Sequence, residues 1–227
     1  MPWLSPPGKG LSNHKRPSEA RSGTGSGLGD RIERGLTRGA GLKIRFPRRP
    51  EGLSAGYGDA RRRFAEGDLL CFRGRGFVSA AIRLVTRSAY SHVGLVHLFE
   101  GHVYCLEAVA SGVRLCRMSE EVKRYDGGID YFQVSAADGA QRRGAVGFAF
   151  QQLGRPFDFV GLARFFLRIV LHAPLKARAD GRFFCAELVA RAYAAQGLPL
   201  VEQAAASTSP SDLAASPQVR FLFRIKR

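Results

Sequence analysis

A cysteine at the expected start of a helix is the strongest candidate nucleophile in this 227-residue chain. Leu188, Val189 and Ala192 follow Cys185 at the spacing of one helical face, so the thiol lies at the beginning of the buried stripe. The positive end of the helix dipole and the free backbone N–H groups there favour the thiolate. The same N–H groups could bind the oxyanion formed when a thiolate attacks a carbonyl. A small core thiol that only packs is the alternative.

A β-hairpin much earlier in the chain brings a histidine and a glutamate together. If Glu100 and Gly101 form the centre of a two-residue turn, position 94 pairs with position 107. Because side chains alternate along a strand, His92, Gly94 and Glu107 then share one face, and His92 and Glu107 are diagonal neighbours. A carboxylate on this apolar face is costly to bury unless it is paired, and His92 is the nearest partner. An incidental contact at a solvated strand end is the alternative.

These residues together supply the parts of an activated cysteine. Cys185 would be the nucleophile, His92 the general base and Glu107 the residue that orients the base. Tyr90 lies two positions before His92, and we expect it either to line the same site or to pack as a buried aromatic side chain.

The remaining cysteines and histidines do not follow a metal-binding pattern. Cys71, Cys105 and Cys116 begin no expected helix, so we expect them to be small core thiols. His97 and His102 fall on the opposite hairpin face from Cys105, where we expect them to be exposed, and no pair has the spacing typical of zinc ligands. The sequence therefore predicts no metal site and no cofactor.

Strand-like segments come first and helix-like segments later in the region after Phe64. This order favours an α+β domain with a mostly antiparallel sheet packed with helices. The expected strands are 69–72, 92–98, 102–108, 113–117, 129–134 and 219–225, and the expected helices are 77–86, 140–153, 157–172 and 183–196.

Residues 1–63 differ in composition from the rest of the chain. They are strongly basic, rich in glycine and proline, and have little apolar periodicity, so we expect a disordered basic arm before a folded domain at 64–227. The glycine-rich run 23–29 lacks a preceding strand and a following Lys-Ser/Thr, so we expect no nucleotide site there. The formal net charge is +16, but the sequence has no zinc-finger or aromatic RNA-binding signature, so we expect no specific nucleic-acid partner.

Composition also bounds the class of protein. A hydrophobic content of 45% excludes a wholly disordered chain, and no window reaches the roughly 18 apolar residues that cross a bilayer. The N-terminus does not read as a secretory signal, and four cysteines without a CxxC pair are typical of a reducing compartment. We therefore expect a cytoplasmic protein.

Several short motifs occur in an order that resembles a known family. They are Gly67-Asp68-Leu69, Ser91-His92-Val93-Gly94-Leu95, Leu106-Glu107-Ala108, Gly112-Val113, Gly154-Arg155-Pro156-Phe157-Asp158 and Phe184-Cys185-Ala186-Glu187-Leu188-Val189. From about Ala65 to the C-terminus, the chain resembles the circularly permuted branch of the NlpC/p60 papain-like superfamily, which is related to the lecithin:retinol acyltransferase-like proteins. The resemblance implies a papain-like fold in which Cys185, His92 and Glu107 have the three roles above. Ala186 stands where many relatives have serine.

The resemblance implies a cysteine-dependent hydrolase or acyltransferase that cleaves an amide or ester bond through a thioacyl intermediate. The expected substrate is a small acyl amide, an acyl ester or a peptide. A cell-wall peptide amidase of the same fold and a catalytically inactive basic binding module are the alternatives.

The apolar segment 157–171, in which Arg164 and Arg168 lie four residues apart, also has several interpretations. It could line an acyl-chain groove, rest on an anionic membrane surface or form a two-sided core helix. The sequence leaves the oligomeric state open.

Overall fold

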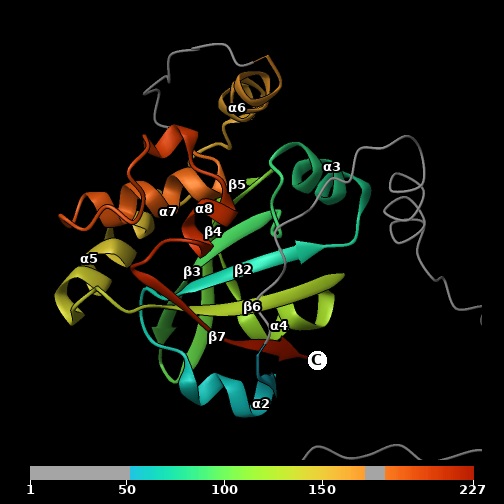
Figure 1. Ribbon diagram of the computed structural model, residues 1–227. Coiled ribbons are helices and arrows are strands. Elements are labelled where there is room, and N and C mark those ends of the chain that lie inside the picture. Colours follow the sequence, from blue (N-terminus) through green and yellow to red (C-terminus); the bar gives the residue numbers. More distant parts are fainter. Residues whose placement is uncertain (1–51, 172–181) are drawn as a thin grey trace, which may run out of the picture.

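A seven-stranded sheet runs through the part of the chain that the computed structural model describes, residues 52–171 and 182–227 (Figure 1). The strand order is β1-β7-β6-β2-β3-β4-β5, and every neighbouring pair is antiparallel except β1 and β7. The expected α+β class is confirmed. The strands are β1 Ser54–Gly56, β2 Leu69–Gly74, β3 His92–Phe99, β4 His102–Val109, β5 Gly112–Arg117, β6 Gly127–Val134 and β7 Val219–Lys226. The helices are α2 Tyr57–Ala60, α3 Phe77–Val85, α4 Met118–Arg124, α5 Gly139–Phe150, α6 Phe159–Leu171, α7 Cys185–Ala194 and α8 Pro210–Ala214, with 3₁₀ turns at Arg61–Arg63 and Ala205–Ser207.

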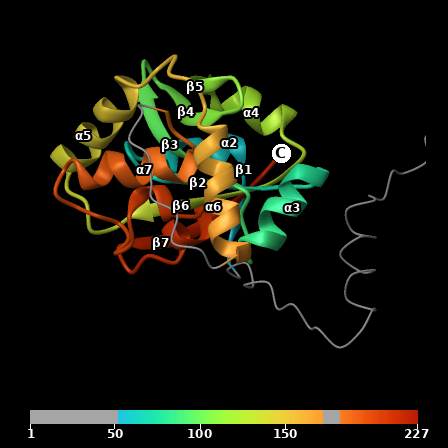
Figure 2. The same ribbon diagram turned by 90° about the horizontal axis from the view of Figure 1, so that it is seen from above.

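Apolar side chains cover both faces of the sheet and form two cores. On one face, Val93 and Leu95 of β3 and Leu106 of β4 pack with α5, α7 and α8. On the other face, Phe72 of β2 and Val96 of β3 pack with α2 and α4. Alternate residues of β3 therefore belong to opposite cores, because successive side chains of a strand point to opposite faces. From above, α6 and α7 lie in front of the strands (Figure 2).

The hairpin of β3 and β4 has the expected register. Phe99 pairs with His102 and Leu95 with Leu106, and the turn residues Glu100 and Gly101 have φ angles of 47° and 71°. Two successive positive φ angles are typical of the type I′ turn, whose twist matches that of the flanking strands. The turn chemistry of two residues thus fixes which side chains face each other along both strands.

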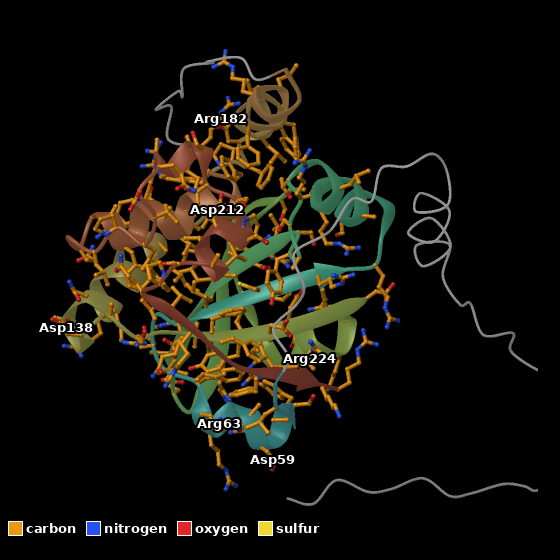
Figure 3. The ribbon with its side chains drawn as sticks, viewed as in Figure 1. Asp59, Arg63, Asp138, Arg182, Asp212 and Arg224 are labelled. Atoms are coloured by element: carbon orange, nitrogen blue, oxygen red, sulfur yellow. The ribbon has the colours of Figure 1, made fainter. Side chains whose placement is uncertain are left out.

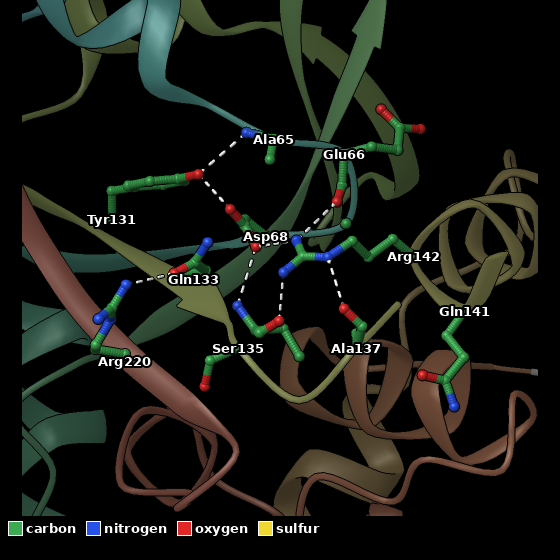
Figure 4. Close-up of polar contacts among 12 residues, drawn as sticks. Ala65, Glu66, Asp68, Tyr131, Gln133, Ser135, Ala137, Gln141, Arg142 and Arg220 are labelled. Atoms are coloured by element: carbon green, nitrogen blue, oxygen red, sulfur yellow. Dashed lines mark hydrogen bonds and ion pairs between the residues drawn. The ribbon is translucent and has the colours of Figure 1, made fainter. Parts of the chain in front are cut away.

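A buried aspartate ties the beginning of β2 to the end of β6 (Figure 4). The Asp68 carboxylate is fully buried, accepts a hydrogen bond from the Val134 N–H at 3.0 Å and also binds Tyr131 Oη and Arg142 Nη1. Arg142 belongs to α5 and donates in addition to the carbonyl of Val134. Because all three partners come from other elements, Asp68 holds β2 in place relative to both β6 and α5.

The position next to this aspartate, Gly67, requires a glycine. Its φ angle is 77°, and a Cβ atom there would lie 2.7 Å from Tyr193 Oη and 3.1 Å from the Arg142 Cα atom. The Tyr193 hydroxyl donates to the Gly67 carbonyl at 2.6 Å, which links the start of β2 to α7. The Gly67-Asp68-Leu69 motif is therefore explained by packing.

Replacing Asp68 with alanine should destabilise the protein by about 3–5 kcal/mol, because it leaves the largely buried Arg142 guanidinium without its counter-charge. The measurement is the free energy of unfolding in guanidinium chloride. Asp126→Ala is the matched control, because Asp126 is exposed and lies 4.0 Å from an exposed Arg75, and it should leave the unfolding free energy unchanged. Equal stability of the two variants would contradict this interpretation of Asp68.

The folded unit begins earlier than the expected boundary at residue 64. Ser54–Gly56 forms β1, which pairs with β7, and the Arg224 N–H donates to the Leu53 carbonyl at 2.8 Å. Ala60 of α2 is fully buried. The expectation of disorder is thus wrong for this stretch, because a three-residue strand held by backbone hydrogen bonds needs no apolar alternation. The rest of the expected arm, 1–51, and its glycine-rich run lie outside the described residues.

The expected strands and long helices are found with shifts at their ends. The helix expected at 157–172 is α6, Phe159–Leu171, and the one expected at 183–196 is α7, which starts at Cys185 itself. The short elements α4 and α8 were not expected. Within the described ranges, no helix has the length and apolar character to cross a membrane.

Candidate active site

Cys185 is the first residue of α7, as its sequence context indicates. Phe184 before it is extended, with φ −99° and ψ 167°, and no side chain caps this helix end. The first-turn N–H groups are therefore available to an oxygen that develops negative charge beside the sulfur. Leu188, Val189 and Ala192 are buried, so the apolar stripe that anchors the helix is the one expected.

His92, the first residue of β3, binds Glu107 directly. His92 Nε2 lies 2.6 Å from Glu107 Oε2, and the side chains of His92 and Glu107 are 18% and 1% exposed. A Cβ atom on Gly94 would lie 3.2 Å from the Glu107 Cβ and 2.5 Å from Cys105 Sγ, so this glycine gives the carboxylate and the thiol their room. The diagonal contact expected across the hairpin is present.

The imidazole of His92 lies at the same pocket as Cys185. Burial lowers the pKa of His92, but the neighbouring Cys185 and Glu107 side chains outweigh this effect and raise it to about 10. Since Nε2 is engaged by Glu107, Nδ1 is the ring atom left for the sulfur. The structure thus brings the three expected residues together at one pocket.

Glu107 is held by more partners than the sequence suggested. Arg114 donates from Nε at 2.9 Å and from Nη2 at 2.6 Å to Glu107 Oε1. The thiols of Cys116 and Cys105 lie 3.5 Å from Oε1 and 3.7 Å from Oε2. Burial raises the pKa of Glu107, but His92 and then Arg114 outweigh it and hold the pKa at about 2. The carboxylate therefore stays ionised although it is buried.

Arg114 is the main site residue that the sequence analysis missed. It lies directly opposite Glu107 in the β4–β5 register, where Val109 pairs with Gly112. The signal was a second two-residue turn, at Ala110 and Ser111, which places an arginine across from the glutamate.

A pocket of about 290 Å³ opens beside Cys185 and His92. Its lining combines apolar side chains with hydroxyl and charged groups. The apolar lining residues include Ile82, Val109, Phe157, Leu162 and Phe184, and the polar ones include Ser79, Ser91, Arg114, Glu121 and Tyr125.

Tyr90 packs in the core instead of lining this pocket. It is buried, its hydroxyl donates to Asp130 Oδ2 at 2.8 Å, and its ring meets Phe132 edge to face at 5.8 Å. The substrate-binding role expected for Tyr90 is replaced by the packing alternative. The strand begins at His92, so the alternation that would have put Tyr90 on the face of His92 does not extend to it.

The residues near Glu107 do not fit a metal site. Ligand atoms of Cys105, Glu107 and Cys116 lie within 4.8 Å of one another. However, His92 and Arg114 already bind the two Glu107 oxygens, and the guanidinium would repel a cation. A hydrogen bond with Cys116, burial and the charge of Glu107 raise the pKa of the Cys105 thiol well above its usual range, which opposes the thiolate that metals require.

His97 and His102 also do not form a metal site with the cysteines. His97 Nδ1 lies 2.8 Å from Glu66 Oε1. Its ring is largely buried near Tyr104 and Phe150, so the expectation that it is exposed is wrong. His102 is exposed, as expected.

Fold and site together define a permuted papain-like protein, in which the histidine strand precedes the cysteine helix. The family model described as "Permuted papain-like amidase enzyme, YaeF/YiiX, C92 family" matches residues 63–222, and the chain belongs to this family. The crystal structure of metalloprotein yiiX from Escherichia coli O157:H7 is similar, with a TM-score of 0.55 and 21% identity over 69% of this chain and 95% of that chain. No match was found among curated proteins. The resemblance to permuted papain-like proteins and the expected fold are confirmed.

Proposed function

We propose that this protein is a cysteine-dependent amidase or esterase that uses Cys185, His92 and Glu107. The observation that carries the proposal is the position of the His92 ring, which binds Glu107 through Nε2 and lines the same pocket as Cys185. Membership of the amidase family supports a cysteine hydrolase. The perturbed pKa values of His92 and Glu107 argue against an inactive binding module, because such shifts concentrate where groups are tuned for chemistry.

The chemistry follows from this arrangement. The Cys185 thiolate attacks the substrate carbonyl carbon, and the backbone N–H groups at the start of α7 stabilise the oxygen as it becomes negative. The His92 imidazolium gives its proton to the leaving amine or alcohol as the bond to the carbonyl breaks, which leaves a thioester on Cys185. Neutral His92 then takes a proton from water as the water attacks the thioester, and the acid leaves with the thiolate restored. An alcohol or amine in place of water would make the same cycle an acyl transfer.

Glu107 and Arg114 keep the imidazole in the state that this cycle needs. The ionised Glu107 accepts from Nε2, which orients the ring and stabilises its positive charge in both steps. Arg114 fixes the carboxylate through two donors on Oε1, which leaves Oε2 for the histidine. Arg114 is therefore a positioning residue that acts through Glu107.

The lining of the pocket indicates the kind of substrate. Its apolar side chains, such as Phe157 and Leu162, suit an acyl chain, and its hydroxyl and charged groups, such as Tyr125 and Glu121, suit a polar leaving group. An apolar acyl group therefore fits better than a polar cell-wall peptide as the part retained on Cys185. The test is turnover of aryl amides and aryl esters that carry either fatty acyl chains or short peptides. Fatty acyl probes should react faster and leave an acyl mass on Cys185, whereas faster peptide cleavage would favour the peptidase alternative.

The pH dependence of the same turnover should report His92. The imidazolium supplies the proton to the leaving group, so kcat/KM should fall above the His92 pKa of about 10 and not near 6.5, the ordinary value. An NMR titration of His92 checks the assignment, and Cys185→Ala should lower its pKa because the sulfur's charge helps to raise it. A His92 pKa that is ordinary in both proteins would contradict the interaction with Cys185.

A further inference from the structure

Helix α6 is apolar on its outer side as well as its inner side. On the inner side, Phe165 is buried and its ring lies 5.8 Å from that of Phe184, next to Cys185. On the outer side, Phe159, Val160 and Leu167 are 59%, 47% and 45% exposed. Helix α6 is therefore not the two-sided core helix that was one interpretation of the sequence, because within the described residues its outer apolar side stays exposed.

Arginines lie near this outer side. Arg182 is exposed beside α6 (Figure 3), and Arg164 of α6 itself is half-buried. The acid nearest in sequence, Asp158, is buried and accepts a hydrogen bond from the Gly161 N–H at 2.7 Å at the start of the helix. An apolar surface bordered by arginines and lacking an exposed acid in 154–171 complements an anionic lipid headgroup layer with an apolar interior.

The position of α6 connects this surface to the pocket. The helix projects at one end of the molecule, beyond α7, and Arg182 lies beside it (Figures 1 and 3). Leu162 of α6 and Phe157 just before it line the pocket that contains Cys185. A surface that bound the outer side of α6 would therefore lie close to the pocket that contains Cys185.

We propose that α6 docks this protein on an anionic lipid bilayer, with Phe159, Val160 and Leu167 inserted among the headgroups and the arginines at the headgroup level. A single helix with three inserted side chains gives weak, reversible binding that needs both apolar contact and negative lipid charge. The interaction does not depend on the chemistry of Cys185, so its failure and the failure of the hydrolase proposal are distinct.

Insertion is tested with tryptophan probes in the full chain, which has one tryptophan of its own. Phe159→Trp is compared with Phe99→Trp, a matched control because Phe99 is 54% exposed on the β3–β4 hairpin. Vesicles of phosphatidylcholine and phosphatidylglycerol with brominated acyl chains should quench the fluorescence of Phe159→Trp more strongly than that of Phe99→Trp. Equal quenching of the two variants would overturn the proposal.

Vesicle sedimentation separates insertion from simple charge attraction, to which a net charge of +16 contributes everywhere on the chain. A Phe159→Ser, Leu167→Ser double variant should bind the anionic vesicles about 10-fold less tightly than the wild type, at both low and high salt. Phe99→Ser should bind like the wild type. Unchanged binding of the double variant would contradict docking by α6. Loss of self-association by the double variant in analytical ultracentrifugation, without a change in vesicle binding, would assign the surface to a second copy of the chain instead.

Discussion

Replacing Cys185 with alanine should reduce turnover of an aryl amide or ester by about 10³-fold or more, with no acyl group retained on the protein. The alanine side chain fills nearly the same space at the start of α7 but has no atom that can form the thioester. Cys185→Ser should be almost as inactive, because a hydroxyl beside His92 is far less ionised than a thiol. Rates are measured by release of the aryl group, and the acyl-enzyme by intact mass.

The matched control is Cys71→Ala. Cys71 lies in the core against the same helix layer, but burial raises the pKa of its thiol well above its usual range. It should retain most of the turnover and the acyl mass. If Cys185→Ala kept the activity of the wild type, the assigned nucleophile would be wrong, whatever the effect of Cys71→Ala.

Replacing Glu107 with glutamine should lower kcat by on the order of 10²–10⁴-fold, with a smaller change in KM. The amide has the size of the carboxylate but cannot stabilise the imidazolium, so the His92 pKa should fall and the alkaline limb of the pH profile should move to lower pH. Glu120→Gln is the control, because Glu120 is an exposed acid on α4 that pairs with Arg124. A pH profile of Glu107→Gln that matched the wild type would show that Glu107 has only a structural role.

Glu107 should also affect stability in acid. Its folded pKa of about 2 lies below the ordinary value of 4.5, so its ionised form stabilises the native state above pH 4.5, and this contribution is lost as the pH falls towards 2. Glu107→Gln should therefore be less stable than the wild type at neutral pH, and the difference should shrink in acid.

The sequence predicted the parts of the site that depend on local rules. Alternation along β3 and β4 and the turn at Glu100 and Gly101 were sufficient to place His92 beside Glu107, since a hairpin register depends on a few adjacent residues. The helical spacing after Cys185 was sufficient to place the thiol at a helix start. The proximity of Cys185 to His92 depends on how distant elements pack, and only the family resemblance predicted it.

The elements that were missed lack such local signals. β1 has three residues and is held by backbone bonds to β7, and α4 has seven residues whose fold depends on burying Met118 and Val122 under the sheet. Tyr90 was expected on the site face because alternation was extended beyond the true start of β3. In each of these cases the structure depends on contacts between distant parts of the chain, which the apolar periodicity of the sequence does not reveal.

We propose that His92 activates Cys185, and this role is tested by the rate at which iodoacetamide alkylates each cysteine. Cys185 is only 9% exposed and Cys116 is more accessible, so accessibility alone predicts that Cys116 reacts first. If the imidazolium stabilises the thiolate, Cys185 should react fastest of the four cysteines, and His92→Ala should slow its reaction by about 10-fold or more. Faster alkylation of Cys116, with no effect of His92→Ala on Cys185, would show that His92 does not activate Cys185.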